Sequence, residues 1–257
     1  MKKLVLFVAV ACLLAACKDE NEDIIGQYFF EGSKVSDNHT DDAETPAEVP
    51  LDGLVAYFPF EGDLKDMCGN LQAVPIGNLQ VRLGHSNDSW SIYFPGDVNN
   101  YIIVKYSDIL QMNKWTINLW FNYEFTDFMD GALVQMGKAK VPGSLFIGTN
   151  IVRVVNREGT SQYAYFMGGE EVYPGLSSWH MLTVSVKDSE VRVWLDRRQQ
   201  LEGTLSAAYV NNVTEHMLIG ASKWDGTVSM PFQGLIDDVR IYNRVLSDEE
   251  IQTLYLN

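Results

Sequence analysis

GLIDDVRIYNRVLSDEEI, residues 234–251, combines the pattern of a strand with the start of a helix. Its first half is rich in Ile, Val and Tyr, as expected for a strand that enters a core, yet Asp237 and Asp238 stand side by side within it. Successive side chains of a strand point to opposite faces, so one of these carboxylates should face the core side of the sheet. We expect Asp237 to continue the core face of the strand, pointing between two sheets near their edge, and Asp238 to face outward beside Arg240.

The second half of this stretch predicts a short C-terminal helix. Ser247 is a favourable N-cap residue, and Glu250, three positions later, completes a capping box. Ile251, Leu254 and Tyr255 then fall on one helical face. Because no other segment is patterned so clearly, this is the one helix that we predict with defined ends.

The rest of residues 51–257 reads as many short strands. Apolar runs rich in Val, Ile, Tyr, Phe and Trp are separated by clusters of Gly, Asn and Asp, and several runs alternate. In WTINLWF, for example, Trp115, Ile117, Leu119 and Phe121 share one face. Period-two patterning over many short runs predicts two packed antiparallel sheets in one large all-β domain.

Six phrases in this region resemble, in the same order, those of laminin-G-like, concanavalin-A-like jelly-roll domains. They are LVAYFPFEGDLKDMCGN (54–70), YFPGDVNNYIIV (93–104), WTINLWFNY (115–123), SSWHMLTVSV (177–186), VRVWLD (191–196) and FQGLIDDVRIYNRVLSDEEIQTLY (232–255). The resemblance implies an all-β, two-sheet antiparallel jelly-roll sandwich over residues 51–257 with a short C-terminal helix. It implies much less about function, since this fold carries lectins, glycosidases, lyases, adhesins and passive spacers.

The same resemblance implies a structural calcium ion. In similar domains the first acid of the phrase found here at residues 234–251 commonly helps to hold calcium against the loop after the first strand. Asp237 should therefore meet residues 61–70. The other expected oxygen ligands come from Glu61, Asp63, Asp66 and Asn70. Calcium takes about six to eight such ligands, and the site would clamp the two ends of the domain together. A metal-free alternative stays open, in which Asp237 accepts backbone N–H groups or pairs with an arginine.

The N-terminal residues predict export and a lipid anchor. Lys2 and Lys3 precede a short apolar run, so residues 1–16 form a secretory signal rather than a membrane-spanning helix. The signal ends in a phrase that resembles the lipobox of bacterial lipoproteins, which makes Cys17 the predicted lipidation site; an ordinary signal peptide is the alternative. Lys18-Asp19-Glu20 resembles a tag for export to the outer surface. We therefore expect an outer-membrane lipoprotein that faces the cell exterior.

Residues 17–50 read as an acidic, flexible tether after the lipidated cysteine. Residues 18–52 hold 11 acidic and 2 basic side chains, and the whole chain has a formal net charge of −15. This acidity argues against nucleic acid and against anionic membrane surfaces as partners, so the membrane is reached through the lipid anchor alone. One apolar island, residues 24–30, could add a strand to a sheet, and the sequence leaves its role and the oligomeric state open.

Catalytic motifs are missing from the sequence. Retaining glycosidases of this architecture often carry an alternating Glu-x-Asp-x-Glu strand, and no such phrase occurs. Of the four histidines, only His180 lies in a clear strand, where the resemblance implies a structural role. We name no catalytic residue and do not expect an enzyme, although a lyase built from scattered Tyr, His and Arg side chains stays open.

Binding is the function that the sequence favours. Sugar sites on such folds use aromatic rings against the apolar faces of pyranoses, so the candidates are aromatic and polar residues in turns. They are Trp90, Tyr173, Trp224 and Asp225. The first hypothesis is a surface-tethered, lectin-like lipoprotein that binds carbohydrate, as an accessory to glycan capture. The second is a non-catalytic adhesive or scaffold module that binds a surface protein, which burial of Trp90 and Trp224 would favour.

Overall fold

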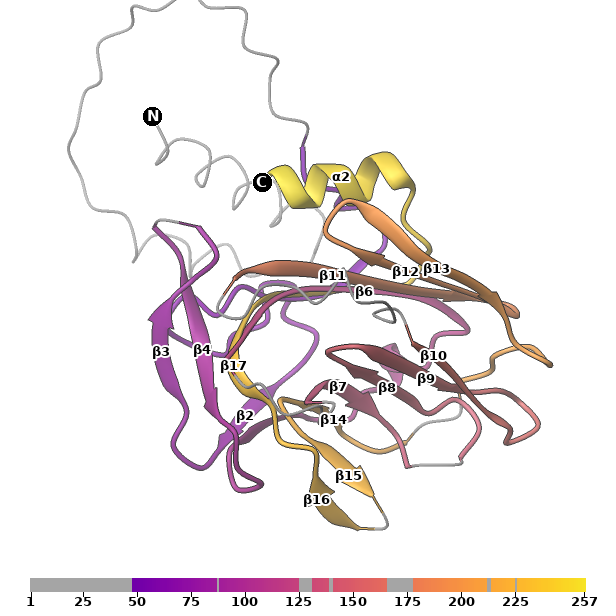
Figure 1. The fold of residues 1–257 in the computed structure, drawn as a ribbon, viewed down its shortest axis with the longest axis horizontal. Helices are drawn as coiled ribbons and strands as arrows, with labels where there is room; N and C mark the ends of the chain where they lie inside the picture. The colour runs from indigo at the N-terminus through magenta and orange to yellow at the C-terminus, as the bar shows by residue number, and fades with distance from the viewer. Residues whose placement is uncertain are drawn as a thin grey trace, which may run out of the picture.

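The computed structural model describes residues 48–86, 88–124, 131–138, 141–165, 178–211, 214–224 and 226–257. Their strands form two antiparallel sheets that lie face to face (Figure 1). None of the helices among these residues is long and apolar enough to cross a membrane. The two-sheet sandwich confirms the predicted fold class.

The eight-stranded sheet, as far as the described residues define it, runs in the order β13-β12-β11-β6-β17-β4-β3, with β1 also paired to β17. Its strands are β1 (Leu54–Phe58), β3 (Gln80–Leu83), β4 (Trp90–Pro95), β6 (Lys114–Tyr123), β11 (His180–Lys187), β12 (Glu190–Leu195), β13 (Arg198–Thr204) and β17 (Gln233–Tyr242). The two neighbouring strands β6 and β17 lie in the middle of this sheet and are each 10 residues long.

The seven-stranded sheet of the described residues has the order β10-β9-β8-β7-β14-β5-β2. Its strands are β2 (Ala73–Ile76), β5 (Tyr101–Val104), β7 (Ala132–Met136), β8 (Leu145–Gly148), β9 (Ile151–Val155), β10 (Ser161–Tyr165) and β14 (Met217–Ile219). A small hairpin of β15 (Ser222–Trp224) and β16 (Thr227–Ser229) projects from this sheet beside β14 (Figure 1).

The core lies between the two sheets. From β6, the side chains of Trp115, Ile117, Leu119 and Phe121 are all buried in it, as the alternating pattern predicts. Each large apolar side chain that is fully buried contributes about 1.5–3 kcal/mol relative to its exposed state. The alternation in this sequence therefore sets which face of β6 points inward.

The outer face of the eight-stranded sheet is covered by α2 (Asp248–Leu256) (Figure 1). Ile251 and Leu254 of this helix are buried in a second apolar cluster with Trp120 and Trp194 of the sheet. The predicted capping box is present: the Glu250 N–H donates to the Ser247 hydroxyl, and the Ser247 N–H donates to the Glu250 carboxylate. The helix thus begins where the sequence predicts and covers part of the outer sheet face.

A β-bulge in β17 changes the direction of Asp237, while Asp238 contacts Arg240 as predicted. The register between β17 and β6 shifts between Asp237 and Arg240, and Asp238 has a positive φ of 52°. Asp237 stands opposite Trp120, on the outer face that α2 covers. The expectation that Asp237 points between the sheets is wrong, because the extra residue reverses the alternation within the strand.

Candidate functional site

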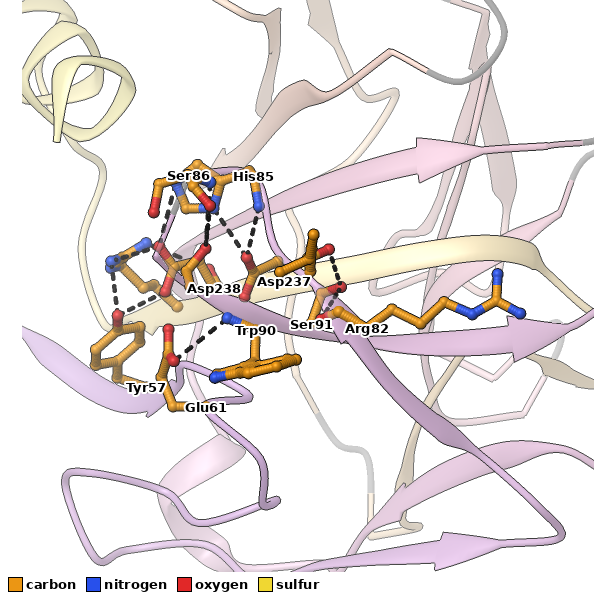
Figure 2. A network of polar contacts seen from close by, with 12 residues as sticks. Tyr57, Glu61, Arg82, His85, Ser86, Trp90, Ser91, Asp237 and Asp238 are labelled. Carbon is orange, nitrogen blue, oxygen red and sulfur yellow. Dashed lines mark hydrogen bonds and ion pairs between the residues drawn. The ribbon is translucent and has the colours of Figure 1, made fainter.

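Asp237 lies in a polar network on the outer face of the eight-stranded sheet (Figure 2). It is 1% exposed, and its Oδ2 atom accepts from the backbone N–H of His85 at 3.1 Å and lies 2.9 Å from Nδ1 of the same residue. A Cβ atom on Gly84 would stand 2.6 Å from this oxygen, so glycine is needed for the approach. Burial has the larger effect and raises the pKa of Asp237 above its usual value, although the hydrogen bond with His85 acts to lower it.

Asp238 holds the second half of this network. It accepts from the Tyr57 hydroxyl at 2.5 Å and from the Arg240 guanidinium at 3.1 Å. The guanidinium also donates to the Tyr57 oxygen at 3.0 Å and lies 4.2 Å from the centre of that ring. Because Tyr57 belongs to β1 and the charged pair to β17, these contacts fasten the first strand of the domain to its last.

His85 completes the network and contacts both its carboxylates and the neighbouring aromatic side chains. Its ring stacks on Trp120 with 4.5 Å between ring centres, and its Nε2 atom lies 3.8 Å from Asp238. Trp179 meets the same imidazole edge-on at 6.1 Å. The network therefore joins the turn between β3 and β4 to β17 and to the cluster beneath α2.

The residue types that a lyase would need, Tyr57, His85 and Arg240, do meet around Asp238. Tyr57 and Arg240 are buried, however, and the His85 side chain is only 11% exposed. Burial raises the pKa of Tyr57 well above its usual value, and its hydroxyl donates to Asp238. The polar groups of Tyr57 and Arg240 therefore connect β1 to β17.

The loop after β1 is organised by Asp66. Its Oδ1 accepts the N–H groups of Tyr57 and Cys68 at 2.8 and 3.0 Å, and its Oδ2 accepts those of Asn70 and Leu71, each at 2.9 Å. These four bonds occupy the approximately four lone-pair positions of a carboxylate. In this structure Asp66 is therefore fully engaged by backbone donors.

The other predicted calcium ligands are divided between this loop and the Asp237 network. The Asn70 amide donates to the Val55 carbonyl at 2.8 Å, and exposed Asp63 accepts the Lys65 N–H. Glu61 stands near the network instead: burial raises its pKa most, and the charges of Asp237 and Asp238 raise it further. Among the described residues no three His, Cys, Asp or Glu side chains form a group that could hold a metal ion. Calcium stays a prediction.

Glu61 and Trp90 form the exposed border of the network. The Trp90 N–H donates to the Glu61 carboxylate at 3.3 Å (Figure 2). The Trp90 residue is 46% exposed. Glu61 is exposed as a whole residue, yet the partial burial of its carboxylate is the main cause that raises its pKa to about 7. Trp90 is thus available to solvent, as the first hypothesis requires.

A separate hollow lies on the outer face of the seven-stranded sheet. It has a volume of about 490 Å³, within the range of about 300–1,000 Å³ that is typical of ligand sites. Its apolar floor and polar rim come from β5, β7, β14, the segment before β14 and the β15–β16 hairpin. The lining residues are Tyr101, Ile103, Gln135, Gly137, Lys138, Thr214, Glu215, His216, Leu218, Lys223, Gly226 and Val228.

The strand register builds this hollow. Leu218 of β14 stands opposite both Ile103 of β5 and Gln135 of β7, so the three side chains form one row on the outer face. Gln135 is 2% exposed; its amide accepts the Lys223 N–H at 3.0 Å and donates to the Lys223 carbonyl at 3.1 Å. These two hydrogen bonds fix the hairpin to the sheet, so the hollow has a rigid wall.

The predicted ligand residues fall in different places. Trp224 ends β15, the hairpin strand whose Lys223 lines the hollow, but its side chain lies outside what the structure describes, as do Asp225 and Tyr173. Trp90 belongs to the other sheet. The turn chemistry around Trp224 thus pointed to the hairpin that borders the hollow, whereas no sequence signal identified Tyr101, His216 or the floor of the hollow.

Comparisons with known proteins agree with this architecture. A family model described as the concanavalin A-like lectin/glucanases superfamily matches residues 81–252. A search of curated proteins gives no match.

Solved structures share the fold at low sequence identity. Domain 4 of AbnA, a GH43 extracellular arabinanase from Geobacillus stearothermophilus, in complex with arabinotriose, is 19% identical, with a TM-score of 0.62 over 79% of this chain and 98% of that one. The binding domain of Paraclostridial Mosquitocidal Protein 1 is 16% identical (TM-score 0.61; 79% and 52%). The binding domain of botulinum neurotoxin DC in complex with rat synaptotagmin II is 14% identical (0.61; 79% and 51%). The chain spans about half the length of these two toxin domains, and at these identities the likeness shows the fold alone.

Proposed function

The chain belongs to the concanavalin A-like lectin/glucanases superfamily, and on this premise we propose that it is a carbohydrate-binding protein whose ligand occupies the hollow on the seven-stranded sheet. The observation that carries the proposal is the composition of that hollow. An aromatic ring and aliphatic side chains, from Tyr101, Ile103, Leu218 and Val228, lie beneath a rim of charged and hydroxyl-bearing side chains.

This composition matches the two surfaces of a sugar. A pyranose has an apolar face of C–H groups, which packs on aromatic and aliphatic side chains, and hydroxyl groups at its edge, which need hydrogen-bond partners. Gln135 keeps the wall of the hollow fixed, so little ordering is needed when a ligand binds. The arabinotriose complex of AbnA domain 4 supports the proposal only to the extent that this fold can carry a sugar ligand.

A glycan array tests the proposal. The chain purified from residue 18 onward, which keeps every described residue, should bind a defined sugar class. Tyr101→Ala should weaken this binding about tenfold or more, because the ring supplies stacking area for the sugar. Tyr93→Ala is the matched control, since Tyr93 is an aromatic residue on the eight-stranded sheet, next to Arg82. A silent array, or equal binding by both variants, would contradict the proposal.

A protein-binding module is a second candidate with an observation of its own. Edge strand β3 carries Val81 and Leu83, which are 44% and 66% exposed, and Leu83 stands opposite exposed Trp90. Exposed apolar residues on an edge strand can receive a strand from another protein. If this surface carries the function, Leu83→Asp should abolish adhesion of cells that display the protein, and glycan binding should be unchanged.

The place of the protein in the cell is also a proposal. The phrase around Cys17 and the tag after it support a lipid anchor on the outer membrane, with the domain facing the exterior. Labelling of cells with a fatty-acid analogue should mark the wild-type chain and not Cys17→Ser. Protease treatment of intact cells should remove the domain from the surface, and its protection would contradict the exterior location.

A further inference from the structure

The rim of the hollow is basic in an acidic protein. The chain has 34 acidic and 19 basic residues and a formal net charge of −15. The side chains that line the hollow include two lysines, Lys138 and Lys223, and one carboxylate, Glu215. Among the described lining residues, the side-chain charge therefore has the opposite sign to that of the molecule as a whole.

Of the two lysines at the rim, Lys223 is better placed than Lys138 to bind a ligand. Its backbone N–H and carbonyl are both bonded to the buried Gln135 amide, so its side chain starts from a fixed point at the wall. Its ammonium group forms no ion pair with any residue that the structure describes. As far as the described residues show, this charge at the edge of the hollow is therefore available to an anion.

The second lysine is only weakly engaged. Lys138 lies 3.7 Å from the Glu215 carboxylate, with side chains 63% and 44% exposed. Exposed pairs of this kind contribute at most about 1 kcal/mol. An incoming carboxylate or sulfate can therefore compete for the Lys138 ammonium, since both pairings are of the same chemical kind.

The rim also offers hydrogen-bond donors to a ligand. His216 accepts the Tyr106 N–H at its Nδ1 atom, at 2.8 Å, which leaves the proton of the neutral imidazole on Nε2 as a donor. The two ammonium groups add donors, and the Gln135 amide is already used within the protein. The complementary ligand is rich in acceptors and carries negative charge.

From these observations we infer that the hollow binds acidic glycans, whose uronate carboxylate or sulfate group pairs with Lys223 and Lys138 while the sugar ring lies on Tyr101. This inference rests on the proposed function and specifies the ligand of the same site. The overall negative charge does not prevent it, because charges farther than about 8–10 Å are largely screened at physiological ionic strength. The contacts at the rim are much shorter than this.

The test is a glycan array with matched pairs: uronate oligosaccharides beside their neutral methyl esters, and sulfated oligosaccharides beside their desulfated forms. Hits should be confined to acidic members, and the two kinds of pair show whether carboxylate or sulfate is recognised. Hits of equal strength on the neutral members would overturn the inference and leave carbohydrate binding intact. An array without hits would overturn the proposed function, and the inference with it.

Calorimetry with the strongest acidic hit then tests the residues. Lys223→Gln should weaken binding about tenfold, the effect of one charge-assisted contact, and Lys223→Glu should weaken it further. Lys187→Gln is the matched control, since exposed Lys187 ends β11 on the other sheet. Raising the salt concentration should weaken wild-type binding more than that of Lys223→Gln. If Lys223→Gln and Lys187→Gln bind alike, the inference is wrong.

Discussion

Asp66 is a single side chain that holds a whole loop in place. It is 3% exposed, and its four backbone bonds join the middle of β1 to both sides of the turn at residues 66–71. The sequence singled out Asp66, but as an expected oxygen ligand of calcium. It could not show that the partners are N–H groups, since these depend on how the loop folds back.

Replacement of Asp66 should therefore be costly. We expect Asp66→Ala to lower the free energy of unfolding by about 3 kcal/mol, because several buried or half-buried N–H groups lose their acceptor. Asp63→Ala, in the same loop, removes an exposed carboxylate with one N–H partner and should cost less than about 1 kcal/mol. Urea denaturation measures both. Equal effects would contradict the role assigned to Asp66.

Asp238 should matter in a different way, because it neutralises a buried charge. Asp238→Ala leaves the Arg240 guanidinium, which is 6% exposed, without its carboxylate. Loss of one partner from a buried ion pair typically costs about 3–5 kcal/mol. Asp88→Ala, on the exposed turn before β4, is the control and should change little. A stable Asp238→Ala variant in urea denaturation would show that the network does not fasten β1 to β17.

The predicted calcium site depends on single side chains of the same region, and removal of the metal tests it. If calcium binds as the sequence predicts, EDTA should lower the melting temperature, and Asp237→Ala should remove the dependence on calcium. The proximity of Glu61 to Asp237 and Asp238 is the feature that supports such a site, since a divalent cation would relieve the repulsion among these carboxylates. A melting curve unchanged by EDTA would count against calcium.

At the scale of elements, α2 packs its apolar side chains into the second apolar cluster, on the outer face of the eight-stranded sheet. Leu254 is 2% exposed and packs with Trp120, Trp194 and Tyr242. Leu254→Ala should lower the free energy of unfolding by about 2–5 kcal/mol, because it leaves a cavity beneath the helix. Gln252→Ala, at an exposed position of the same helix, should be nearly neutral. Thermal unfolding of both variants checks whether α2 packs as described.

The start of α2 also predicts a pH dependence. The bond to Arg244, at 2.6 and 2.7 Å, is the main cause that lowers the pKa of Glu250. A lowered pKa in the folded state stabilises the protein above the usual range of the carboxyl group, and this stability is lost as the pH falls through the folded value. The melting temperature of Glu250→Gln should therefore fall less steeply below pH 5 than that of the wild type. The control Glu158→Gln should keep the wild-type slope.

Elements were predictable where the sequence signal is local. The alternation in β6 and the capping box of α2 needed only neighbouring residues, and both were confirmed. The bulge at Asp238 was not predicted, because a positive φ at an aspartate depends on the strands on either side. The predicted direction of the Asp237 side chain was wrong for the same reason.

On the scale of the whole molecule, the two sheets have different outer faces. One is covered by α2, while the other carries a hollow formed by segments from residue 101 to residue 228. No motif of adjacent residues marks such a site, so its floor could not be predicted from sequence. Only the hairpin with Lys223 and Trp224 was indicated, because its turn residues form a local pattern.

The most direct test of the central claim is to locate the bound sugar. Backbone amide resonances of the chain from residue 18 onward are followed by NMR while the strongest glycan from the array is added. We predict the largest shift changes at Ile103, Gln135, Leu218 and Val228, which surround the hollow, and small changes at Trp90. Changes centred on Trp90 and β3 would contradict the claim and place the ligand on the other sheet.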